Sequence, residues 1–211
     1  MKNEELGMSN GKKMRSLYSL IPLEDFKAVL NVDDRDDKLS CYCLTTATYS
    51  IEEFCHRRLT EKKYFEDLAF WGDRALPLSH YPVRKILAVY RMGNREWGAG
   101  NWEMLDPELY RLVPECRAEL DIPCCLVLAN GVRLLQGEFS LRVVYRAGFS
   151  CGKAPVDLAS ACLELAAWNM ARYKGRKIGI TGNGRGQGER LEIAMPENVR
   201  FLLEPYRLKL L

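Results

Sequence analysis

The sequence contains few of the residues, and none of the short motifs, that mark a catalytic centre. Its 211 residues include only two histidines, His56 and His80. Neither lies in a nucleophile or metal-binding motif, and the patterns H-E-x-x-H and G-x-S-x-G are absent. The carboxylates of Glu52 and Glu53 are adjacent on a predicted helix and therefore diverge, so we expect a solvated face there. These absences predict a protein that is not an enzyme and holds no cofactor.

The eight cysteines lack the C-x-x-C spacing of a common zinc site. The first residues carry charges throughout and lack the apolar core of a signal peptide, so we expect that the chain is not exported. We expect most cysteines to be small buried hydrophobic residues in a reducing cytosol, with no metal bound. No run of about 20 apolar residues is present, which predicts no membrane partner.

An excess of one charge is also missing. The formal net charge is only +3, too small for a nucleic-acid-binding surface that covers the whole protein. Hydrophobic residues at 47% and charged residues at 28% are close to the averages of soluble globular proteins. The length suits one substantial domain, or a small domain with a large insertion.

Two long amphipathic helices are predicted by apolar residues at three-and-four spacing. The first spans residues 37–58 and closes on Arg57 and Arg58. The second spans residues 156–173, opens at Pro155 and ends at Gly175. We expect their apolar stripes to pack against each other.

A short helix is predicted just before the first long one. Its expected inward face is Leu23, Phe26, Val29 and Leu30. Aspartates follow at positions 33, 34, 36 and 37, but a calcium loop would also need a glycine at its sixth position and a glutamate at its last. We therefore expect these aspartates to cap the N-terminus of the next helix.

Residues 62–149 predict a β-rich insertion, because short β-branched or aromatic runs alternate there with glycine, proline and asparagine. Asn130-Gly131 is a strong hairpin signal, which predicts that residues 124–129 turn back onto residues 132–135. The segment between Pro77 and Pro82 is expected to be a loop or a strand edge. The predicted fold class is α+β, with a helical core of two long packed helices plus short helices, and an antiparallel β-rich insertion.

A glycine-rich segment, "KGRKIGITGNGRGQG", follows the second long helix. Its glycines do not fit a dinucleotide-binding loop, which must follow a strand and open a helix. Alternate glycines favour a mobile arm that becomes ordered only against a partner. The arm's basic residues have no acidic neighbour before Glu189 and fit either DNA phosphate or an acidic subunit, while a solvated loop remains equally compatible. These residues are Arg172, Lys174, Arg176, Lys177 and Arg185.

A last helix is predicted from Pro196, with Val199, Leu202 and Leu203 facing inward. The order of all these elements resembles the head-to-tail connector proteins (adaptor or head-completion proteins) of long-tailed phages and prophages. In that family an acidic turn precedes a long helix, as residues 33–37 do here, and the helix closes as His56-Arg57 does. The family's second long helix opens on a proline-aspartate-leucine sequence, which Pro155, Asp157 and Leu158 match in this chain. Its terminal pattern is matched by Pro196, Val199, Leu202, Leu203, Pro205, Tyr206 and Arg207.

The resemblance implies a leader at 1–19, a helical connector core at 20–61 and 150–211 with a basic arm at 174–190, and an insertion at 62–149. It further implies a structural virion protein that docks on the portal ring and forms a ring of twelve copies, which extends the DNA channel between head and tail. The implied partners are further copies of the chain, the portal protein, the next neck or tail component, and DNA in the channel. The implied location is the head-tail interface of the virion, and the bacterial host cytoplasm before assembly. The alternative is a nucleic-acid-binding accessory protein that acts through the basic arm.

Overall fold

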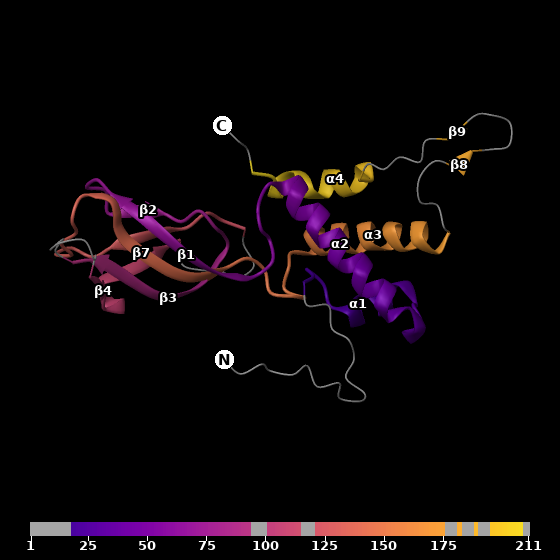
Figure 1. Cartoon of the computed structure of the whole chain (residues 1–211), viewed down its shortest axis with the longest axis horizontal. Coiled ribbons are helices and arrows are strands. Elements are labelled where there is room, and N and C mark those ends of the chain that lie inside the picture. The colour runs from indigo at the N-terminus through magenta and orange to yellow at the C-terminus, as the bar shows by residue number, and fades with distance from the viewer. Residues whose placement is uncertain are drawn as a thin grey trace.

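The structure is a computed structural model that describes residues 18–93, 101–114, 121–175, 181–182, 188–189 and 195–208. It combines helices with antiparallel sheets, which confirms the α+β class. Figure 1 shows an elongated molecule with helices at one end of its long axis and most strands at the other. The helices are α1 (Leu23–Leu30), α2 (Asp37–Cys55), α3 (Val156–Lys174) and α4 (Glu197–Leu203), with short 3-10 helices η1 (Asp34–Asp36), η2 (Pro107–Leu109) and η3 (Glu204–Tyr206).

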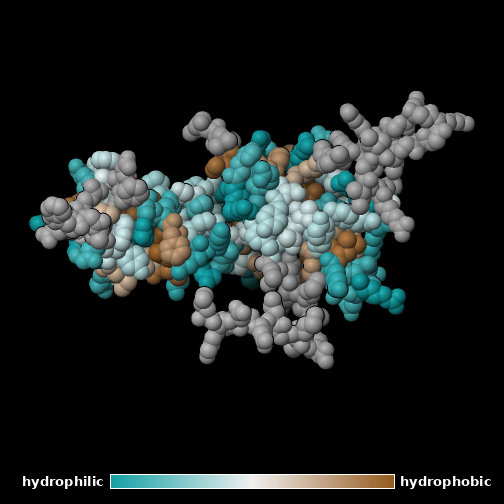
Figure 2. All heavy atoms as spheres, viewed as in Figure 1, coloured by the Kyte–Doolittle hydropathy of each residue, from teal (hydrophilic) through white to brown (hydrophobic). Residues whose placement is uncertain are grey.

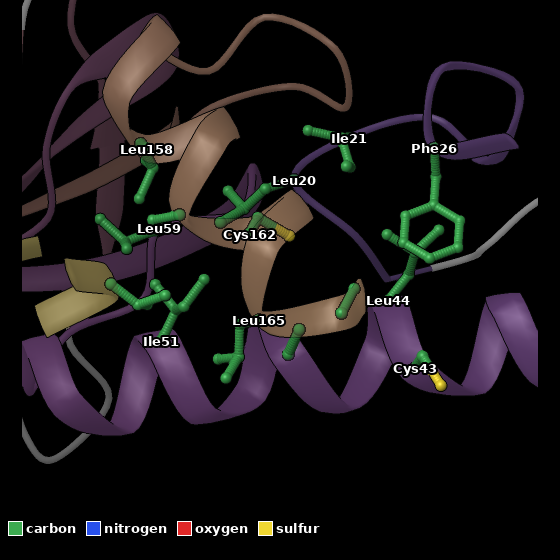
Figure 3. Packing of buried hydrophobic residues seen from close by; sticks show 14 of the residues in the cluster. Leu20, Ile21, Phe26, Cys43, Leu44, Ile51, Leu59, Leu158, Cys162 and Leu165 are labelled. Atoms are coloured by element: carbon green, nitrogen blue, oxygen red, sulfur yellow. The ribbon is translucent and has the colours of Figure 1, made fainter. Parts of the chain in front are cut away.

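The four helices share one hydrophobic core, and we call this part the helical half. Figure 3 shows Leu44 and Ile51 of α2 facing Leu158, Cys162 and Leu165 of α3. The Thr48 hydroxyl and the Cys162 thiol lie 3.7 Å apart across the same contact. Cysteines take part in this packing as small apolar residues, and those at 41, 43, 55 and 162 are free and buried.

Two details of the helical half differ from the predictions. Val29 was expected to face inward, but its side chain is 64% exposed, because α1 uses Leu23 and Phe26 to contact the core. The first long helix ends at Cys55 rather than continuing to Arg58, because His56 adopts the left-handed conformation with φ of 55°. Arg57 and Arg58 therefore lie outside α2, and their side chains contact Asp121 and Glu52, respectively.

The strands β1 to β7 form two antiparallel sheets around a second core, and we call this part the strand half. One sheet has the order β1-β7-β3-β4 and the other β2-β6-β5. Leu68, Val143 and Tyr145 of the first sheet share a buried cluster with Leu76 and Leu126 of the second. The strands are β1 (Lys62–Phe70), β2 (Ala75–Pro77), β3 (Val83–Met92), β4 (Trp102–Met104), β5 (Tyr110–Val113), β6 (Cys125–Leu128) and β7 (Gly137–Ala147).

The hairpin predicted at Asn130-Gly131 is wrong in its strand pairing. Gly131 does form a turn, with φ of 98°. However, β6 is already paired with β2 on one edge and β5 on the other, so residues 132–135 have no free edge to join. They instead lead the chain to β7 in the other sheet.

The two halves are joined where the segments around Thr60 and Phe149 lie side by side and form a parallel β-bridge, which we call the crossing. The Phe149 amide donates to the Leu59 carbonyl at 2.6 Å, and the Glu61 amide donates to the Phe149 carbonyl at 2.9 Å. Gly148 beside them has φ of 100°, and a Cβ atom there would lie 2.5 Å from the Thr60 carbonyl oxygen. Glycine is therefore required at this crossing, both for its backbone conformation and for space.

Candidate functional site

A cleft of about 990 Å³ lies where the C-terminal end of α2 meets the loop before β3. Tyr49 and Glu52 of α2 form part of its wall, and His80 and Tyr81 of the loop form another part. The cleft thus lies between the helical half and the strand half.

Glu52 is the most constrained side chain of this cleft, with only 3% of its side chain exposed. Its Oε1 accepts hydrogen bonds at 2.9 Å from the Leu59 amide, the Thr60 amide and the Thr60 hydroxyl. Its Oε2 accepts from Arg58 at 2.8 Å and from the Tyr18 hydroxyl. Burial alone would raise the pKa of Glu52, but these hydrogen bonds together hold it below its ordinary value. The carboxylate therefore remains ionised and fixes the chain between α2 and β1.

The prediction of a solvated face for Glu52 and Glu53 is thus wrong for Glu52, while Glu53 is exposed. The sequence does contain a signal for this outcome. Leu44, Thr48, Glu52 and Cys55 recur at spacings of four, four and three residues and are all buried. The side chains of Glu52 and Glu53 therefore diverge as expected, but Glu52 belongs to the buried stripe of α2 and only Glu53 faces solvent.

Arg57 and Asp121 form an ion pair across the two halves, with 8% and 15% of their side chains exposed. The Arg57 guanidinium also lies 4.1 Å from the centroid of the Tyr81 ring. Burial raises the pKa of Asp121 even though Arg57 opposes that shift. Among the described residues, Arg57 Nε and Nη1 and Asp121 Oδ1 have no hydrogen-bond partner. The predicted role of Arg57, closing the last turn of α2, is replaced by this contact, which sequence spacing alone does not reveal.

Both histidines line the cleft, but their structural surroundings differ. His80 stacks on Tyr64 with ring centroids 3.8 Å apart, and burial lowers its pKa. His56 is the left-handed cap of α2. Within the described parts of the chain, no three His, Cys, Asp or Glu side chains gather in the way that a metal ion requires. In the same residues, each helix is too short or too polar to cross a bilayer.

The predicted C-terminal assembly residues lie mostly in the chain's own core. Val199, Leu203 and Tyr206 are buried, and Leu202 packs beside them. The Tyr206 hydroxyl donates to Asp157 Oδ1 at 2.5 Å, which joins the terminal segment to the start of α3. Pro196 is the N-cap residue of α4.

Arg207, the last of these residues, lies 5.4 Å from the centroid of the Phe54 ring and 3.9 Å from Glu204. Phe201 lies on the other side of α4 and is 81% exposed. The exposed apolar residue of α4 is therefore Phe201, which the motif did not mark.

The basic arm is described only in part. Lys174 forms an ion pair with Asp36, and Arg172 lies 4.5 Å from the centroid of the Trp168 ring. Arg176, Lys177 and Arg185 lie outside the described residues. The short strands β8 (Thr181–Gly182) and β9 (Gly188–Glu189) pair antiparallel, a ladder that sequence reasoning did not predict.

Comparison with known proteins shows a common fold at low sequence identity. No protein-family model and no curated protein sequence matches the chain. The neck of an empty gene transfer agent particle, determined with C6 symmetry, contains a chain 23% identical with a TM-score of 0.58, and the match covers 91% of this chain and 92% of that one. The virion of the native gene transfer agent particle gives 24% identity and a TM-score of 0.56 over the same shares.

The neck of the native particle, determined with C12 symmetry, also contains a matching chain. It is 24% identical with a TM-score of 0.55, and the match covers 94% of this chain and 97% of that one. The chain therefore shares its fold with chains found in the necks of gene transfer agent particles.

Proposed function

We propose that the chain is a structural subunit of the neck of a phage-like particle. In this role it docks on the portal ring and forms, with further copies, a ring that extends the DNA channel between head and tail. The single observation that carries the proposal is the likeness to gene transfer agent necks, which covers 91–94% of the chain and so includes both halves. The C12 symmetry of one of those necks supports a ring of twelve copies. The location that follows is the virion neck, after synthesis in the cytoplasm of a bacterial host.

The geometry of the cleft supports a structural role. Five hydrogen bonds converge on the Glu52 carboxylate, three on Oε1 and two on Oε2. A carboxylate used in this way holds the backbone of residues 59–60 in place rather than exchanging protons with a substrate. This use of Glu52 supports a structural rather than a catalytic role for the proposed subunit, in which a helical connector core and a β-rich insertion serve assembly.

We assign the portal-facing contacts to the end of the helical half that carries α4. Phe201 is 81% exposed there, and Val156 at the start of α3 is 83% exposed. Apolar side chains exposed to this degree suit a contact with another protein better than solvent. The basic arm at 174–190 follows the C-terminal end of α3 in the sequence, and we assign to it a contact with a neighbouring subunit or the portal.

The alternative of a nucleic-acid-binding accessory protein gains less support. Of the five basic residues assigned to the arm, Lys174 is neutralised by Asp36 and Arg172 is stacked on Trp168. A nucleic-acid site would keep such residues available for phosphate.

The test is to mix the full chain with the purified portal ring from the same genome and to weigh the complexes by mass photometry. The expected result is one additional ring of whole-number stoichiometry per portal. A variant that lacks residues 176–188 should fold normally but attach far more weakly. A portal mass that stays unchanged at high protein concentration would contradict the proposal, and salt-sensitive binding to duplex DNA in that case would favour the alternative.

A further inference from the structure

A row of basic side chains crosses the outer face of the larger sheet. In the strand register, Lys63 of β1 lies opposite Arg146 of β7, and Arg146 lies opposite Lys85 of β3. All three residues are exposed. Arg146 has Glu61 at 3.2 Å, whereas no described residue forms an ion pair with Lys63 or Lys85. Like charges directly opposite each other on neighbouring strands are destabilising, so the row costs the isolated chain stability and an anionic partner would remove that cost.

An apolar row lies beside the basic row on the same face. Phe65, Val144 and Ala88 are opposite one another in the register, two residues along from Lys63 and Arg146. Phe65 is 67% exposed, and its ring lies 4.7 Å from the Lys63 ammonium. Val144 lies between Val143 and Tyr145 of the buried cluster and so belongs to the other side of the sheet, but it is only 6% exposed, so Phe65 is the apolar side chain that this row presents to a partner. Figure 2 shows hydrophobic and hydrophilic side chains intermixed over the strand half.

A surface of the opposite character lies on α1, in the helical half. The inner face of α1 is taken up by Leu23 and Phe26, and Glu24, Asp25 and Val29 face outward. Val29 is 64% exposed. Among the described residues, neither Glu24 nor Asp25 forms an ion pair, although Lys27 on the same helix is bound to Asp34 and Asp37. α1 therefore offers two unneutralised carboxylates next to an exposed apolar side chain.

The spacing of the two surfaces matches. From Asp25 to Val29 a helix rises about 6 Å, four residues at about 1.5 Å each. From the Lys63 row to the Phe65 row a strand advances about 6.8 Å, two residues at about 3.4 Å each. A helix laid along the strands could therefore place its carboxylates over the basic row and Val29 over the apolar row at the same time.

We propose that the outer face of the β1-β7-β3 sheet binds the α1 face of a second copy of this chain. The proposal rests on the ring of the proposed function and names the contact that would build it. The sheet and α1 lie in different halves of one elongated chain (Figure 1). Two different, complementary patches give a heterologous contact, which repeats from copy to copy and closes into a ring by rotation. Opposite charges at the rim of such a contact select the partner and its register.

The first test exchanges the charges of the two surfaces. The sheet variant is Lys63→Glu with Lys85→Glu, and the helix variant is Glu24→Lys with Asp25→Lys. All four positions are exposed, so both variants should unfold within a few degrees of the wild type. Each variant alone should lose at least tenfold in ring formation on the portal. A chain that carries all four substitutions should recover assembly, and so should a mixture of the two variants, because alternate copies then present opposite charges.

Normal ring formation by the sheet variant would overturn the proposal. So would a loss of assembly that neither the fourfold variant nor the mixture restores, since that pattern would assign the sheet to another partner. Binding of duplex DNA by the wild type, lost in the sheet variant but not in the helix variant, would assign the basic row to phosphate instead.

The second test does not use the portal and so separates this proposal from the proposed function. The background chain carries Cys116→Ser and Cys151→Ser, because Cys151 is an exposed free thiol that would itself form disulfides between chains and Cys116 lies outside the described residues. In this background, a chain with Lys63→Cys and Asp25→Cys is oxidised at high protein concentration, and the products are separated by non-reducing electrophoresis. The two introduced thiols should give a ladder of multimers, whereas each single variant should give no ladder. A ladder without a portal-bound ring would leave the contact intact and reject the neck function. A portal-bound ring without a ladder would support the neck function and reject the proposed contact between the sheet and α1.

Discussion

The two halves of the molecule differ in how their charges are neutralised. In the helical half, Lys27 binds Asp34 and Asp37, Lys174 binds Asp36, and Glu52 binds Arg58. In the strand half, ion pairs such as that of Arg142 with Asp67 lie at one level of the sheet, while Lys63 and Lys85 flank Arg146 at another. The helical half thus pairs these charges within itself and leaves the carboxylates of Glu24 and Asp25 on α1, whereas the sheet leaves the ammonium groups of Lys63 and Lys85 without an ion-pair partner among the described residues.

The largest expected effect comes from breaking the crossing that joins the two halves. Gly148→Ala should destabilise the protein by about 3 kcal/mol or more, because the new Cβ meets the Thr60 backbone and the φ is unfavourable for alanine. Gly131→Ala is the matched control, since Gly131 has φ of 98° but nothing within 4 Å of its Cβ position. It should cost only about 1 kcal/mol. Urea unfolding measures both values, and equal losses would show that the close approach at the crossing does not matter.

The next effect tests the internal neutralisation of the helical half at Glu52. Glu52→Ala removes the acceptor of five hydrogen bonds and should cost about 3 kcal/mol. Glu53→Ala, one position along on the exposed side of α2, should change the free energy of unfolding by less than about 0.5 kcal/mol. Similar values for the two variants would return Glu52 to the solvated role that sequence pattern alone assigned to it.

A pH series compares two buried carboxylates whose pKa values are shifted in opposite directions. The pKa of Glu52 is lowered from 4.5, so its stabilisation is present above that pH and is lost as pH falls through the folded value. The pKa of Asp121 is raised from 3.8, so the stability it contributes falls as pH rises above 3.8. The stability difference between wild type and Glu52→Gln should therefore grow with pH, and that between wild type and Asp121→Asn should shrink. Denaturant midpoints between about pH 3 and pH 7 measure both, and parallel slopes would refute the assignment.

The smallest expected effect is a gain in the free energy of unfolding, whereas most substitutions lower it. Lys85→Glu places a carboxylate beside Arg146 and should stabilise the isolated chain by about 0.5 kcal/mol. Arg133→Glu, at an exposed position outside the sheet, makes the same charge change and should have no measurable effect. Thermal unfolding at low salt measures the shift. A loss of stability in Lys85→Glu would show that the basic row is not a cost to the free chain.

Patterns with regular periodicity allowed much of the fold to be predicted. The apolar stripe of residues 158–166 lies in the core as expected, and Gly175 is the C-cap of α3. The short runs between residues 62 and 147 are strands. These features depend on local spacing and capping, which the sequence carries directly.

Features that depend on distant partners could not be predicted. Arg57 meets Asp121, which is 64 positions away, and no local rule marks that pair. The hairpin at Asn130-Gly131 failed because the edges of β6 were already occupied, which only the sheet order reveals. The basic row of the sheet likewise appears only when the register places Lys63, Arg146 and Lys85 side by side.

The most direct test of the account is electron cryomicroscopy of the full chain bound to its portal ring. The account predicts a closed ring stacked on the portal, in which the β1-β7-β3 face of each copy covers α1 of its neighbour. A portal without added density, or density that does not form a ring of this fold, would contradict the assignment of this chain to the neck.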